Sequence, residues 1–242
     1  MDAITKYFIV LITNLATMPT LVIMLVQLFK KYRASVDPDT GKHDPVRLLV
    51  LLQILFWFTS VLYPTIYRLV ELEDPGSMFT SLNLASLFVA FMIAAGVSLL
   101  SFVHHKESWM YAAWFFYLGI VIYSLFTGLE FTFFSWQFSL SPGMGNTAGT
   151  FFVLQFIFVL VGQMALDIFY FITGKKYKDD KIFGLGIFFL MPIISGMASE
   201  NPFVYMICYG FLAIYGIPYA TGKIKFFKAK PAVPVIAAEV RE

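Results

Sequence analysis

Long apolar runs separated by short polar segments dominate the chain. Seven such runs lie at about 7–29, 46–69, 79–103, 109–134, 147–174, 182–199 and 203–222. Each is close to the ~20 residues that a helix needs to cross a bilayer. Because lipid offers the backbone no hydrogen-bond partners, such runs are expected to be α-helical. The pattern predicts an all-α integral membrane protein, with residues 1–222 forming one bundle of seven transmembrane helices.

Lysine and arginine are distributed unevenly between these runs. The first, third and fifth loops and the segment 223–242 together hold all 17 basic residues except Lys6 and Arg68. Cytoplasmic loops of membrane proteins carry the excess of positive charge. The distribution therefore predicts an N-terminus outside, a C-terminus in the cytoplasm, and a basic cytoplasmic tail over 223–242.

Composition limits what else the chain can contain. Of its 242 residues, 59% are hydrophobic and 13% are charged, whereas roughly a quarter are charged in ordinary soluble domains. Seven spans leave about 100 residues for loops and tails, and none of these stretches is long enough to fold alone. We therefore expect the lipid bilayer as the main partner, no soluble catalytic domain and no nucleic-acid partner; the pattern names no cofactor.

Two carboxylates fall inside the apolar runs, Glu130 in the fourth and Asp167 in the fifth. A charged residue near mid-membrane costs about 2.5–3.5 kcal/mol, so it is usually buried in the bundle and paired. The fifth run also carries a polar stripe within about 120° of a helical wheel, formed by Gln155, Gln163, Asp167 and Tyr170. Such a stripe must face protein or water. Gln155 lies at a depth similar to Glu130 and could form a hydrogen bond with it.

The seventh run adds tyrosines to the candidate site. Tyr205, Tyr209, Tyr215 and Tyr219 also lie on one helical face. If these faces converge, they form a cleft that could pass a proton or hold a small polar or cationic ligand. The candidate ligand- or proton-binding residues are Asp167, Gln163, Glu130, Gln155, Tyr170, Tyr205 and Tyr209. The alternative is that both carboxylates are protonated and form hydrogen bonds that only join helices.

Two spacing patterns bear on how the helices are arranged. The third run carries Ser86, Ala90, Ala94 and Ser98 four residues apart, and small residues on one face let a neighbouring helix approach closely. This predicts a central packing helix. The first and fifth runs end similarly, in Lys-Lys-Tyr-Arg and Lys-Lys-Tyr-Lys. A repeat would give a 3+1+3 arrangement similar to the SWEET sugar-transporter family, but the other helices do not align, so unrelated helices remain the alternative.

These features favour a membrane bundle that binds or translocates a small solute or a proton. The alternatives are a non-catalytic subunit of a larger membrane complex and a seven-helix receptor or sensor. Residues 201–205 read Asn-Pro-Phe-Val-Tyr, which resembles the NPxxY motif of G-protein-coupled receptors. That family carries the motif at the cytoplasmic end of its last helix, whereas here it is expected outside. An enzyme is not favoured, because the sequence offers no nucleophile with a base and no metal cluster, and so no catalytic or metal-binding residue.

Overall fold

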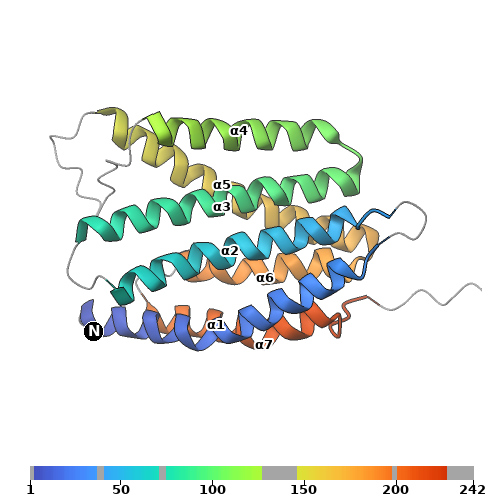
Figure 1. Cartoon of the computed structure of the whole chain (residues 1–242), viewed down its shortest axis with the longest axis horizontal. Coiled ribbons are helices and arrows are strands. Elements are labelled where there is room, and N and C mark those ends of the chain that lie inside the picture. The colour runs from blue at the N-terminus through green and yellow to red at the C-terminus, as the bar shows by residue number, and fades with distance from the viewer. Residues whose placement is uncertain (1–2, 37–40, 71–74, 127–145, 198–200, 228–242) are drawn as a thin grey trace, which may run out of the picture.

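The protein is an all-α chain in the computed structural model (Figure 1). The structure describes residues 3–36, 41–70, 75–126, 146–197 and 201–227. Within these residues there are seven helices: α1 (Ala3–Arg33), α2 (Pro45–Val70), α3 (Pro75–His104), α4 (Glu107–Phe126), α5 (Asn146–Tyr177), α6 (Asp180–Met197) and α7 (Pro202–Thr221). Each coincides with one of the apolar runs. The end of the fourth run, 127–134, lies outside the described residues.

Three of the described helices contain segments that are long and apolar enough to cross a membrane. These segments are Phe8–Arg33, Pro45–Leu62 and Pro202–Thr221. Residues such as Ile12 and Ile214 leave more than half of their surface exposed, as expected where lipid rather than protein covers a side chain. The chain is therefore a multi-pass integral membrane protein.

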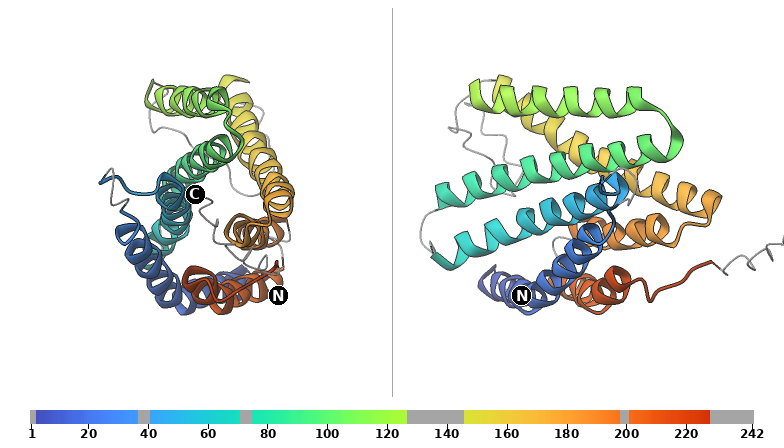
Figure 2. Two further views of the ribbon diagram at one scale, coloured as in Figure 1. Left: turned by 90° about the vertical axis from the view of Figure 1, so that its right-hand side faces the viewer. Right: turned by 45° about the vertical axis from the view of Figure 1, so that its right-hand side comes forward.

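Six of the helices follow one another around a ring. The neighbours are α1 and α2, α2 and α3, α3 and α5, α5 and α6, and α6 and α7, and α7 packs back against α1. The end-on view in Figure 2 shows this ring, with α4 outside it beside α3. Helix α3 contacts α2, α4 and α5, and its small residues Ala90, Ala94 and Ser98 are buried. The predicted central packing role of this helix is confirmed, although the side chain of Ser86 lies outside the described ones.

Aromatic and aliphatic side chains fill the ring. The rings of Trp57 on α2 and Phe188 on α6 form a T-shaped pair with centroids 5.0 Å apart, and the Trp57 ring lies 6.1 Å from that of Tyr209 on α7. Ile54 and Leu212 are completely buried in the same cluster. The core therefore joins α2, α6 and α7 through apolar contacts.

Local hydrogen bonds set several helix ends. The Asp179 carboxylate accepts from the backbone N–H of Lys181 and of Ile182, at 2.7 Å and 3.2 Å, and so caps the start of α6. Asn201 caps α7 in the same way by accepting from the N–H of Phe203 at 3.1 Å. The proline that follows Asn201 occupies the first turn, where its missing N–H is not needed. The Asn-Pro pair of the NPxxY-like segment is thus a helix start.

Candidate functional site

The buried polar stripe of α5 centres on Asp167 and Gln163. Both side chains are almost completely buried, at 3% and 7% exposure. They lie one helical turn apart, and the Gln163 amide Nε2 donates to Asp167 Oδ1 at 3.1 Å. Their neighbour Tyr170 is also buried. The described part of the predicted stripe therefore faces the protein interior.

Each member of this pair keeps an oxygen without a partner. Asp167 Oδ2 and Gln163 Oε1 are the two buried side-chain atoms in the described part of the chain that have no hydrogen-bond partner. Buried polar atoms are rarely left in this way. If Asp167 is ionised, Asp167 Oδ2 and Gln163 Oε1 are both acceptors without a donor, although Asp167 Oδ1 still accepts from Gln163. A neutral Asp167 carries one O–H, which can donate to a single acceptor such as Gln163 Oε1.

Tyr170 connects this stripe to α2. Its hydroxyl donates to Oε1 of Gln53, and both residues are completely buried. Gln53 in turn donates through Nε2 to the carbonyl oxygen of Leu49 at 3.3 Å. The connection passes α3 at Gly96, where an added Cβ would lie 2.5 Å from the Tyr170 hydroxyl and 3.1 Å from Gln53 Oε1. Glycine at position 96 is therefore what lets α2 and α5 join across α3.

Tyr205 of α7 belongs to a different polar group. Its hydroxyl donates to Asn14 Oδ1 at 2.5 Å, and Asn14 Nδ2 donates to Thr65 Oγ1 at 2.9 Å. Asn14 is buried on α1 and Thr65 on α2. The ring of Tyr209 stacks on that of Tyr205 at 4.2 Å. This group ties α1, α2 and α7 together.

The candidate residues thus fall into three sets. Gln163, Asp167 and Tyr170 lie together on α5. Tyr205 and Tyr209 lie with α1 and α2. Glu130 lies outside the described residues, and Gln155 is on α5 where side chains are not described.

Sequence reasoning missed two amides that the structure places in these groups, Asn14 and Gln53. The signal was available, since Gln53 is the lone amide of the second run and Asn14 shares the first run only with Gln27. An amide in the hydrocarbon region needs partners just as a carboxylate does, because lipid supplies none.

The chemistry of the site follows from its oxygens. Asp167 Oδ2 and Gln163 Oε1 can accept hydrogen bonds from a proton carrier, an ammonium group or water, or coordinate a hard cation, which prefers oxygen ligands. Within the described residues no three His, Cys, Asp or Glu side chains come together. Comparison with protein-family models, curated proteins and solved structures finds no match to this chain.

Proposed function

We propose that this protein binds or translocates a proton or a small solute through its helix bundle, with Asp167 and Gln163 as the binding pair. The observation that supports the proposal is the pair of buried oxygens without partners on α5. A carboxylate that only joined helices would be expected to use its hydrogen-bonding capacity on neighbouring helices. Asp167 instead bonds to Gln163 on its own helix.

The proposal includes a membrane arrangement for the whole chain. All seven helices cross the bilayer, with the N-terminus outside and the C-terminus in the cytoplasm. The uneven distribution of lysine and arginine supports this orientation. Helices α4 and α5, which carry exposed apolar residues such as Phe115 and Ile172, then face lipid.

Proton flux through reconstituted protein tests the role of Asp167. Purified protein is placed in liposomes that contain a pH-sensitive dye, and a potassium diffusion potential drives protons inward. Asp167→Asn keeps an oxygen that can accept from Gln163 but cannot bind a proton in this range of pH. We expect wild-type flux above that of empty liposomes and loss of that excess in Asp167→Asn.

The matched control makes the same chemical change at an exposed carboxylate. Glu107 begins α4 and is exposed, so Glu107→Gln should leave the flux unchanged. Thermal unfolding of both variants is followed in parallel. Full flux in a folded Asp167→Asn protein would remove Asp167 from the proposed mechanism.

A second measurement addresses a solute other than the proton. Native mass spectrometry of gently solubilised protein detects bound small molecules and co-purifying chains together. A stoichiometric small molecule that is lost on Asp167→Asn supports the proposal. Wild-type protein that shows neither proton flux nor a bound solute, but reproducible partner chains, contradicts it and favours an accessory subunit.

A further inference from the structure

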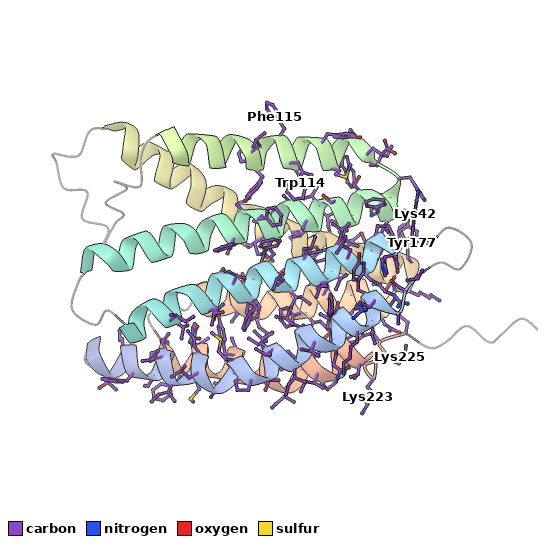
Figure 3. All side chains as sticks on the ribbon, viewed as in Figure 1. Lys42, Trp114, Phe115, Tyr177, Lys223 and Lys225 are labelled. Atoms are coloured by element: carbon purple, nitrogen blue, oxygen red, sulfur yellow. The ribbon has the colours of Figure 1, made fainter. Side chains whose placement is uncertain are left out.

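Four basic side chains from four different parts of the chain gather at one end of the bundle. Lys31 is near the end of α1, Arg47 is near the start of α2, Lys181 is near the start of α6, and Lys225 follows α7. The positive charges of Lys181, Arg47 and Lys225 are near enough to Lys31 to repel its ammonium group. Figure 3 labels Lys225 at this end, together with Lys223 and Lys42. We call these four residues the basic cluster.

Arg47 is held in this cluster by two contacts. Its Nη1 donates to the carbonyl oxygen of Lys31 at 3.0 Å. Its Nε lies 3.3 Å from Asp44 Oδ2, and Asp44 also caps α2 by accepting from the N–H of Val46 at 2.9 Å. The guanidinium is thus fixed between the end of α1 and the start of α2.

The segment after α7 is folded back onto α6 at Asp180. Its Oδ1 accepts from the backbone N–H of Phe226 at 2.7 Å and of Phe227 at 3.0 Å, and its Oδ2 lies 3.6 Å from Lys225 Nζ. Desolvation opposes ionisation of Asp180, but the two N–H donors and Lys225 outweigh it and keep the pKa below its ordinary value. The rings of Phe226 and Phe227 also pack on Phe183, with centroids 5.0 Å and 5.4 Å away. These contacts place Lys225 in the cluster.

The cluster has more positive charge than its carboxylates balance. Asp44 pairs with Arg47, and Asp180 pairs with Lys225. Lys31 and Lys181 have no carboxylate within ion-pair distance in the described part of the chain. Asp179 is engaged with backbone N–H groups at the start of α6. Two lysine ammonium groups thus remain available to an external anion.

The depth of the cluster narrows the chemistry of that anion. The candidate spans Phe8–Arg33 and Pro202–Thr221 end beside it, and Pro45–Leu62 begins there. The cluster therefore lies at the level of lipid headgroups. Arginine and lysine donors suit phosphate oxygens, and basic residues next to membrane spans attract anionic lipids.

We infer that the basic cluster binds a phosphate group, carried either by an anionic phospholipid headgroup or by a soluble phosphate. Lys31 and Lys181 supply the free ammonium groups, and Arg47 and Lys225 are held beside them. The site is separate from the Asp167 pair and does not depend on the function proposed for that pair.

Lipid binding to the full chain tests this site. Detergent-solubilised protein is titrated with short-chain phosphatidylglycerol, with phosphatidylcholine as reference, and bound lipid is counted by native mass spectrometry. We expect wild-type protein to prefer phosphatidylglycerol, and the double variant Lys31→Gln, Lys181→Gln to lose about tenfold or more in affinity for it.

The control removes the same charge from exposed lysines at the same end of the bundle, away from the cluster. Lys106→Gln with Lys175→Gln should leave affinity unchanged within about threefold, because scattered surface charges are screened by salt. An equal loss in both double variants, or none in either, would overturn the inference.

A competition arm separates the two sources of phosphate. Inorganic phosphate that displaces phosphatidylglycerol from wild-type protein, but does not bind the cluster variant, identifies a site for soluble phosphate. Lipid binding that phosphate does not displace identifies a headgroup site. Wild-type protein that neither prefers phosphatidylglycerol nor binds inorganic phosphate contradicts the inference in both forms.

Discussion

At the scale of single residues, buried polar side chains decide how the helices are joined. Asn14 is the clearest case, because its amide uses both the oxygen and the nitrogen to reach α7 and α2. Trp114 of α4 likewise donates through Nε1 to Ser98 of α3 at 2.8 Å, and Figure 3 labels it on the side of α4 that faces α3. Against this background the unused oxygens of Asp167 and Gln163 are exceptional among the described residues.

We predict that Tyr205→Phe destabilises the protein by about 0.5–1.5 kcal/mol, since it removes a donor to Asn14 and leaves a buried oxygen unpaired. Measured side-chain hydrogen bonds between membrane helices average near the lower value, about 0.6 kcal/mol. The free energy of unfolding in mixed detergent micelles gives the comparison. Tyr111→Phe is the control, because Tyr111 is 64% exposed; equal effects of the two substitutions would refute a role for this bond.

The sequence identified only some of these residues, for a physical reason. A carboxylate in an apolar run stands out because its charge is costly anywhere in the membrane. An amide such as Gln53 shows its importance only through its partner, and Tyr170 is 117 residues away in the chain. Asn14 and Tyr205 are 191 residues apart. Pairings over such distances depend on helix arrangement, which local patterns do not contain.

At the scale of helices, positions were predictable and neighbours were not. The predicted run 203–222 and helix α7 (Pro202–Thr221) differ by one residue at each end. Apolar length and the Asn-Pro cap carry that information locally. No local signal placed α4 outside the ring, because its all-round apolar surface is equally suited to lipid and to protein.

Glycines control the closest helix contacts, and where α5 meets α6 the atoms nearest to the glycine belong to the backbone. A Cβ added at Gly174 would lie 2.6 Å from the backbone nitrogen of Phe183 and 2.7 Å from its Cα. Backbone atoms cannot rotate aside as the end of a side chain can. We therefore predict that Gly174→Ala destabilises the protein by about 1–3 kcal/mol through overpacking.

Thermal unfolding followed by tryptophan fluorescence measures this effect. Gly210→Ala on α7 is the matched control, because no atom lies within 4 Å of a Cβ added there. That substitution should leave stability unchanged or raise it slightly, since alanine favours helix. A Gly174→Ala protein as stable as Gly210→Ala would show that α5 and α6 can separate at no cost.

At the scale of the whole molecule, the ring consists of α1, α2 and α3 followed by α5, α6 and α7, with α4 outside it. Helices α1 and α5 therefore each begin one set of three. This order agrees with a 3+1+3 arrangement but does not test for a repeat, since any six helices in sequence order around a ring have it. Seven membrane spans and their orientation also stay predictions, because they rest on the basic residues of the loops.

Cysteine accessibility checks the orientation. In a Cys208→Ala background, which removes the single native cysteine, single cysteines replace Thr5, Lys42 or Lys225. A membrane-impermeant maleimide should label Lys42→Cys and Lys225→Cys only from the cytoplasmic side, and Thr5→Cys only from outside. Labelling of Thr5→Cys and Lys225→Cys from the same face would contradict an odd number of spans.

The contact between α1 and α7 has a consequence for biosynthesis. Asn14 enters the membrane with α1, but Tyr205 arrives with α7, which is synthesised after the other six described helices. Until then the side-chain oxygen Oδ1 of Asn14 lacks its native donor, and the face of α1 that α7 will cover stays open to lipid or to a chaperone. The ring therefore closes only after α7 has been synthesised. A ribosome that stalls before Pro202 leaves an open bundle in which Asn14 lacks Tyr205, and we expect membrane quality control to recognise this exposed polar side chain.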